Sequence, residues 1–204
     1  ADPARRDEMT SILRDRGVLR HWEIPFRKRS GEIGDLDVSA TVVTVNHEPC
    51  LISLASDITE RKKSEREINR LATTDTLTGL ANRAHFSDIA SKEIARANRF
   101  GLPVCVLMLD LDHFKQVNDR HGHLAGSRVL KEVAQVLKDC VRDCDVVSRY
   151  GGDEFVVVLA GAGSNEALRV AERIRAGVAG RCYLNNEGVR LSVCIGVASA
   201  PEHG

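Results

Sequence analysis

PVCVLMLDL, residues 103–111, is a continuous apolar run that is interrupted only by Asp110, close to its end. Such a run is typical of a buried strand at the centre of a sheet, covered on both faces. Further along, residues 146–150 and 154–159 flank Gly151 and Gly152, a pattern that predicts a β-hairpin. We therefore expect one sheet to form the core of the C-terminal part.

The rest of this part, from Asp75 onward, alternates between helical and strand patterns. Apolar residues at helical spacing predict helices over residues 83–100, 124–137 and 167–178, and an apolar stretch predicts a strand over 189–198. This order predicts an α/β (α+β) fold in which helices flank a mixed sheet.

Two earlier segments differ from this pattern. Residues 1–57 alternate apolar and polar side chains in short runs, which predicts a thin antiparallel sheet of three strands whose exposed face needs a partner. Residues 58–74 are dense in charge and have a sparse apolar stripe, which predicts an exposed linker helix. The stripe is too short to decide whether this helix pairs with a copy of itself or stays solvated.

The overall composition excludes a broadly basic nucleic-acid surface. The 204 residues carry 29 Lys and Arg against 29 Asp and Glu, so the formal net charge is zero. The sequence has no transmembrane run and starts without a signal peptide, so we expect a cytoplasmic location and no membrane contact from this segment, while the full-length protein could be anchored elsewhere. The six cysteines form no CxxC pair, which favours reduced thiols over disulfides or a zinc site.

Two carboxylates stand where a predicted strand meets solvent. Asp110 ends the buried run, and Asp153 follows the two hairpin glycines. A charge at the edge of an apolar strand is costly unless something neutralises it, and two such carboxylates commonly hold Mg²⁺ together with a substrate's phosphates. Lys115 and Asn118 follow Asp110 closely, which favours a phosphate site over two unrelated surface acids.

Four motifs together resemble the GGDEF family, the diguanylate cyclases, from about Asp75 to the C-terminus. The hairpin resembles the family signature, and the apolar run with the turn after it resembles the first catalytic strand. The motifs are RYGGDEF at residues 149–155, DTLTGLANR at 75–83, DLDHFK at 110–115 with Asn118 and Asp119, and Gly122, His123 and Gly126 at the next helix start.

This resemblance implies a palm-like, ferredoxin-type fold and a homodimer in which each subunit holds one GTP. Each 3′-hydroxyl would attack the α-phosphate of the opposite GTP, giving cyclic di-GMP and pyrophosphate. The implied metal is Mg²⁺ or Mn²⁺, held by Asp110, the Leu111 carbonyl and Asp153. The other implied roles are phosphate contacts by Phe114 and Lys115, base recognition by Asn118 with His123 nearby, close backbone approach at Gly151 and Gly152, and deprotonation of the hydroxyl by Asp153 or Glu154.

One position departs from the family pattern. The family usually has an aspartate nine residues after the Asn of its ND pair, and this chain has Ser127 there. A carboxylate accepts both donors of the guanine edge, whereas a hydroxyl accepts only one or donates to the N1 of adenine. Losing the carboxylate would cost the guanine complex about 1–3 kcal/mol. Ser127 resembles the hybrid promiscuous GGDEF subgroup, which makes cyclic GMP-AMP from GTP and ATP; the alternative is a neutral substitution in a diguanylate cyclase.

Arg142 and Asp145 form an RxxD pair at the offset of the family's inhibitory product site. The resemblance implies that they bind the cyclic dinucleotide product, with Arg173 on the later helix completing the site. Taken alone, an RxxD pair is usually a surface ion pair.

The front of the chain resembles part of a second family. Residues 17–60 resemble the last strands of a PAS sensor domain, and DITERK at residues 57–62 resembles the junction that often follows one. We expect the C-terminal part of a PAS domain over 1–57, a signalling helix over 58–74 and a cyclase domain over 75–204 with a truncated end, because the family continues into a helix with a phosphate-binding Lys and Arg. Two other functions therefore stay open: a cyclic-dinucleotide receptor and a dimerising signalling module.

Overall fold

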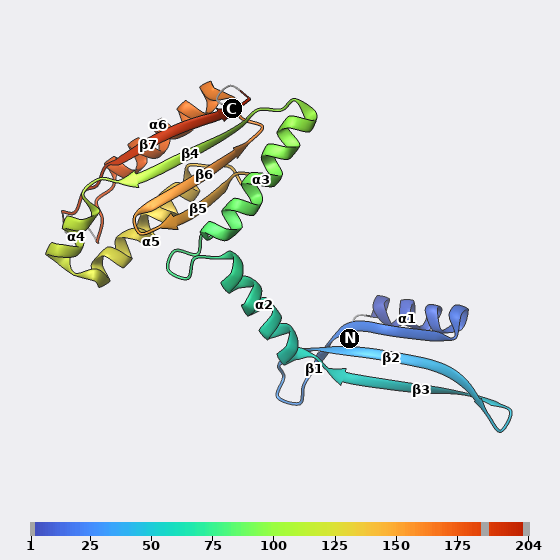
Figure 1. Ribbon diagram of the computed structural model, residues 1–204. Coiled ribbons are helices and arrows are strands. Elements are labelled where there is room, and N and C mark those ends of the chain that lie inside the picture. The colour runs from blue at the N-terminus through green and yellow to red at the C-terminus, as the bar shows by residue number, and fades with distance from the viewer. Residues whose placement is uncertain (1–2, 185–187, 202–204) are drawn as a thin grey trace. The chain divides into compact units, whose positions relative to one another are not determined.

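The computed structural model describes residues 3–184 and 188–201 and divides the chain into two compact units. The first unit is Ala1–Asn69 and the second is Arg70–Gly204, and we describe each by itself (Figure 1). The boundary between them falls within helix α2 (Thr59–Thr73), which confirms the helix expected over 58–74.

The second unit contains a four-stranded sheet with the order β5-β6-β4-β7. Strand β4 (Val104–Leu111) is central, between β6 (Glu154–Ala160) and β7 (Val193–Ala200), and β5 (Val146–Gly151) forms an edge. All pairings between these strands are antiparallel, and a parallel contact occurs only at the isolated bridge between Ala81 and Ser148 within the described residues. The order of elements is that of a ferredoxin-like fold, so the expected α/β fold class with flanking helices is confirmed. The expected mixed sheet was wrong, because the paired strands of this sheet are all antiparallel.

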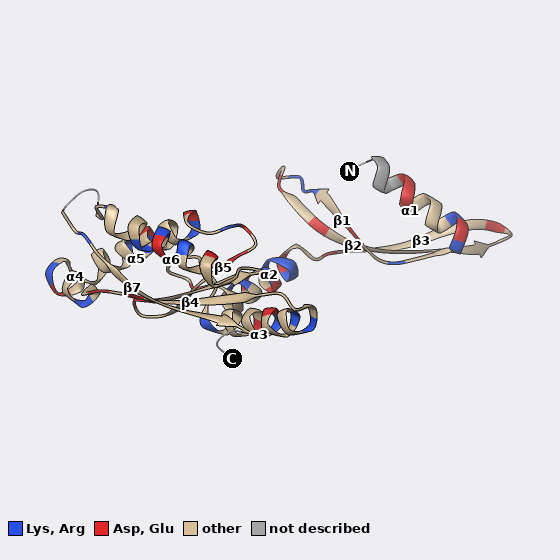
Figure 2. Cartoon of the chain, turned by 90° about the horizontal axis from the view of Figure 1, so that it is seen from above, with Lys and Arg blue, Asp and Glu red and all other residues tan. Residues whose placement is uncertain are grey.

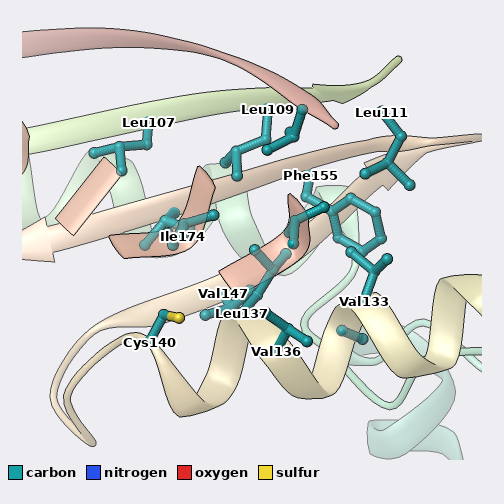
Figure 3. Packing of buried hydrophobic residues seen from close by; sticks show 14 of the residues in the cluster. Leu107, Leu109, Leu111, Val133, Val136, Leu137, Cys140, Val147, Phe155 and Ile174 are labelled. Carbon is teal, nitrogen blue, oxygen red and sulfur yellow. The ribbon is translucent and has the colours of Figure 1, made fainter. Parts of the chain in front are cut away.

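Helices cover the two faces of this sheet unequally. Helices α5 (His123–Asp139) and α6 (Ser164–Gly180) lie on one face, and α3 (Arg83–Phe100) lies on the other, as both views show (Figures 1 and 2). The α5 and α6 face holds the main core, in which Leu107 and Leu109 of β4 pack with Phe155 of β6 and Val133 of α5 (Figure 3). The α3 face has only a small cluster, so part of that face stays open.

The sequence determines the ends of α3 by local chemistry. The Asn82 side chain accepts a hydrogen bond from the His85 backbone N–H and caps the first turn. Gly101 ends the helix in the left-handed region at φ 64°, where glycine has no steric cost. The helix therefore spans Arg83–Phe100, as predicted.

The first unit is a three-stranded antiparallel sheet, which confirms the prediction for this segment. Its strands β1 (Val18–Arg27), β2 (Ile33–Val45) and β3 (Glu48–Asp57) pair in sequence order. Helix α1 (Pro3–Arg16) packs Leu13 against Leu19 and Ala40. Every residue of β3 is exposed, because no described element covers that edge strand.

The start of α2 is fixed by an aspartate cap. The Asp57 carboxylate accepts hydrogen bonds from the backbone N–H and the hydroxyl of Thr59. The hydrogen bond from the Thr59 hydroxyl has the larger effect and the one from the Thr59 backbone N–H the smaller. Together they lower the pKa of Asp57 to about 2. Further along α2, Lys62 forms ion pairs with Glu23 and Asp35 of the sheet.

Three local expectations were wrong. Residues 3–16 form helix α1 although the segment 1–57 was expected to be β structure, because its apolar residues are too few to produce a clear helical period. The turn expected after β4 is a helix, α4 (Phe114–His121), too short for a periodic signal. The last strand begins at Val193 rather than at 189.

The cysteines and the helices add two observations. All six cysteines are free. No helix within residues 3–184 and 188–201 is long and apolar enough to cross a membrane.

Candidate functional site

A hollow of about 370 Å³ lies between α4, the start of α5 and the turn of the β5–β6 hairpin. It brings together most of the residues that the sequence predicted to bind substrate, from stretches up to about 40 positions apart. Gly152 takes a left-handed φ of 47° in the turn, and Asp153 beside it is half-buried. The lining residues are Leu77, Phe114, Lys115, Asn118, His123, Ser127, Leu130, Arg149, Gly152 and Asp153.

Close packing at a glycine holds Asn118 in this hollow. A Cβ added at Gly126 would lie 2.0 Å from Asn118 Oδ1 and 3.0 Å from its Cγ, far inside any real contact. Gly126 therefore lets the Asn118 amide lie flat against α5, within the same wall as Ser127. The turn between the helices is closed by the Gly122 N–H, which donates to the Asn118 carbonyl.

A second group of polar residues lies on the open face of the sheet, at the end of β4. Asp110 pairs in register with Glu154 of β6 on one side and with Cys194 of β7 on the other. Directly paired residues point to the same face, so these three side chains form a row across three strands. They line a hollow of about 360 Å³ together with Met108 and Gly196.

Asp112, two residues after Asp110, is held by the neighbouring strand segment. Its carboxylate accepts hydrogen bonds from the Ser192 hydroxyl at 2.5 Å and from the Cys194 thiol at 3.1 Å. These two bonds lower the pKa of Asp112, and the same contact raises the pKa of Cys194. The link ties the end of β4 to the start of β7.

An ion pair fixes the hairpin turn from behind. Arg149 Nε and Nη2 donate to the Gly152 carbonyl at 3.0 and 2.7 Å, and Nη1 lies 3.3 Å from both oxygens of Asp75. Burial raises the pKa of Asp75, but hydrogen bonds from Thr78 and the Arg149 charge outweigh it and leave that pKa lowered. Both residues lie within family motifs, but the sequence predicts no role for either of them, since nothing in the sequence shows that residues 75 and 149 meet.

The donors near the end of β4 fit a divalent cation of the Mg²⁺ type. They are carboxylate and carbonyl oxygens, the hard ligands that Mg²⁺ prefers, and Mg²⁺ usually needs only one or two protein carboxylates because phosphates and water complete its shell. Among the described residues, no three His, Cys, Asp or Glu side chains gather tightly enough to hold a metal without such help. A metal here would therefore depend on a bound phosphate.

The predicted product site is only partly assembled. Arg142 and Asp145 line one hollow of about 440 Å³, and the Asp145 carboxylate accepts a hydrogen bond from the Arg142 backbone N–H. The Arg142 guanidinium forms an ion pair with Glu166. Arg173 does not line this hollow; its guanidinium donates to the Cys140 carbonyl at 2.8 and 2.6 Å.

The remaining predicted residues are distributed as follows. The Leu111 side chain is buried in the core, and metal binding by its carbonyl stays a prediction. Gly151 is exposed at the end of β5 and does not line the hollow beside α4. Glu154 lines the hollow with Asp110, whereas Asp153 lines the hollow with Lys115.

Comparison with known proteins identifies a family for this chain. The family model described as diguanylate cyclase, GGDEF domain, matches residues 72–204. Diguanylate cyclase DosC of Escherichia coli (strain K12) is 47% identical over 131 residues, covering 63% of this chain and 28% of that protein. Diguanylate cyclase A of Treponema denticola is 30% identical over 184 residues, covering 86% of this chain and 50% of that protein.

A solved structure supports the same grouping. The coiled coil and GGDEF domain of DgcB from Caulobacter crescentus, in complex with c-di-GMP, aligns with a TM-score of 0.65 at 31% identity. The alignment covers 70% of this chain and 76% of that one. The chain spans only 28% and 50% of the two curated relatives above.

Proposed function

The chain belongs to the GGDEF family of diguanylate cyclases, and from this premise we propose that it condenses two GTP molecules into cyclic di-GMP with release of pyrophosphate. The observation that carries this proposal is the hollow in which Lys115, Asn118 and Asp153 meet. It joins a cation for phosphate, an amide for a base and a carboxylate for a hydroxyl proton within one nucleotide-sized space.

The protein's own groups act mainly by positioning. Lys115 and the backbone near Phe114 hold the phosphates, and the Asn118 amide, supported by Gly126, hydrogen-bonds the base with His123 nearby. Asp153 or Glu154 accepts the proton of the attacking 3′-hydroxyl. Phosphoryl transfer needs little covalent chemistry from the protein, so positioning and charge neutralisation carry most of the catalysis.

Asp110 and the Leu111 carbonyl would hold Mg²⁺ or Mn²⁺ when nucleotide is bound, and Asp153, which lines the hollow with Lys115, would complete the set. The ion would supply charge neutralisation on the phosphates. The reaction also requires a homodimer, because each hollow holds one nucleotide and the attacking hydroxyl must come from the other; α2 is the candidate pairing helix.

Ser127 supports a broader substrate range that includes ATP. Its hydroxyl lines the same hollow as Asn118 and replaces a carboxylate that would accept both guanine donors. The proposed additional product is cyclic GMP-AMP, as in the hybrid promiscuous subgroup.

The test is to incubate the full-length protein with Mg²⁺ and equimolar GTP and ATP and to identify the products by mass spectrometry. We expect cyclic GMP-AMP beside cyclic di-GMP, and Ser127→Asp should reduce the share of cyclic GMP-AMP by about tenfold. Ser91→Asp, on the exposed surface of α3, is the matched control and should leave the ratio unchanged. Cyclic di-GMP alone, with no effect of Ser127→Asp, would exclude the broader range but leave the cyclase.

The same experiment separates the cyclase from the two other functions. No turnover combined with saturable binding of cyclic di-GMP would indicate a receptor. The absence of both turnover and binding would indicate a dimerising module. A receptor has no need of Asp110, Lys115 and Asp153, which is why the cyclase is favoured.

Arg142 and Asp145 are the proposed product site. The ion pair between Arg142 and Glu166 must open for a phosphate to bind there, so Glu166 competes with the product. Residues 1–57 are proposed to be the C-terminal part of a PAS domain, on the basis of their three-stranded sheet and the residues that follow it.

A further inference from the structure

Helix α4 separates two hollows that share no lining residue. Phe114, Lys115 and Asn118 line the hollow described above. His113, just before the helix, lines a second hollow of about 340 Å³ together with Gln116 and Arg120. The other wall of this second hollow is the segment 188–192, before β7.

This second hollow is rich in unpaired positive charge. Arg120 from α4 and Arg190 from the facing segment both line it, and neither forms an ion pair within the part of the chain that the structure describes. His113 and His121 lie on the same wall, with the Gln116 amide 3.5 Å from His113 Nδ1. The basic residues of α4 appear as blue segments in Figure 2.

The lining also includes one acidic side chain, which forms no ion pair with either arginine within the described residues. It is Asp112, and both of its oxygens already accept hydrogen bonds, from Ser192 and from Cys194. Two guanidinium groups, each with several N–H donors and no carboxylate partner among the described residues, therefore line a space of this size. Guanidinium groups in such an arrangement match the oxygens of phosphate, to which they can bond in a bidentate way.

We infer that this second hollow is a binding site for a pyrophosphate group, either free pyrophosphate or the polyphosphate of a nucleotide. Its volume is at the lower end of the range for small-molecule sites, which suits an anion of that size. The site is distinct from the hollow lined by Lys115, Asn118 and Asp153, which we call the nucleotide hollow, because α4 lies between them. The inference does not depend on the proposed cyclase activity. A ligand there would bridge α4 and the segment that carries Ser192, and so stabilise the end of β4.

The first test is isothermal titration of the full-length protein with pyrophosphate, in the absence of divalent metal. We expect saturable binding that weakens about tenfold in Arg120→Ala and in Arg190→Ala, because each removes one charged donor pair. Arg169→Ala is the matched control, an exposed arginine of α6 that lines neither hollow, and should bind as the wild type does. Thermal melting of each variant checks folding, which exposed arginines should not alter.

The second test needs no variant and uses histidines as position markers. His113 and His121 line the second hollow, whereas His123 lines the nucleotide hollow. Ring resonances of His113 and His121 should shift on addition of pyrophosphate while that of His123 stays in place. Repeating the titration with GTP, and in Lys115→Ala, distinguishes free pyrophosphate from a nucleotide as the source.

Two results would overturn the inference. One is the absence of saturable pyrophosphate binding. The other is binding that is lost in Lys115→Ala but unchanged in Arg120→Ala and Arg190→Ala, with the shift confined to His123, because the anion would then occupy the nucleotide hollow.

Discussion

The two faces of the β5-β6-β4-β7 sheet use the same strand for opposite purposes. On the face covered by α5 and α6, β4 contributes Leu107 and Leu109, which are fully buried. On the other face, Met108 is 40% exposed and Asp110 stands in a row with Glu154 and Cys194. Because side chains alternate along a strand, stability and chemistry are separated within a few residues.

This difference shows that the row of Asp110, Glu154 and Cys194 depends for its position on residues buried on the opposite face. Two carboxylates and a thiol contribute little apolar contact, so the apolar residues of the opposite face must fix the register of the strands. The first unit lacks such a division, because β3 is exposed on both faces and Leu54 is 69% exposed. The following predictions test the separation, from the largest expected effect to the smallest.

Asp110→Asn should abolish chemistry without changing the fold. Loss of the carboxylate that would bind the metal ion should lower turnover by at least about a hundredfold, while the melting temperature stays within error. The measurement is steady-state cyclase activity beside a thermal melt. Asp88→Asn on the exposed surface of α3 is the control, and a comparable loss there would show that Asp110 has no special role.

Leu109→Ala should lower stability without changing the chemistry. Leu109 is next to Asp110 in β4, on the face covered by α5 and α6. Removing a fully buried side chain from the main core should cost about 2–5 kcal/mol of unfolding free energy. The folded fraction should retain turnover per molecule. Urea unfolding measures the loss; Leu54→Ala, exposed in β3, should change the free energy by less than about 0.5 kcal/mol. Equal effects from the two would mean that the core is not where the structure has it.

Gly126→Ala tests whether nucleotide binding depends on the close packing of Asn118 against the backbone of Gly126. The new Cβ would displace the Asn118 amide, so KM for GTP should rise about tenfold with a smaller change in kcat. Asn118→Ala should give a similar shift, and the double variant should add little to either. Additive effects would show that Gly126 does not act through Asn118.

Asp75 provides the smallest and most local test, at the back of the hairpin turn. Its pKa is lowered in the folded state, so the stabilisation is present above the ordinary Asp pKa of about 3.9 and is lost as pH falls through the lowered value. In Asp75→Asn, the unfolding free energy should therefore decrease less as the pH falls through this range. If the unfolding free energy of the variant falls with acid as much as that of the wild type, other carboxylates cause the loss.

Sequence patterns predicted the elements whose signals are local. The cap at Asn82 and the stop at Gly101 define α3, and the apolar run defines β4. Helix α4 escaped prediction because eight residues contain too few turns for a period to emerge. The motif spacing also predicted which residues share the nucleotide hollow, apart from Gly151, although their roles are still proposals.

The sequence by itself determined the chemical groups and their order: an acid at the end of a buried strand, two glycines before Asp153, and a serine where a carboxylate is usual. Only the tertiary structure decided which groups meet across the chain. It paired Asp110 with Cys194, joined Asp75 to Arg149, and placed Arg120 and Arg190 in the lining of one hollow. The reason is physical: strand register and helix orientation arise from packing between segments distant in the chain, which no local pattern encodes.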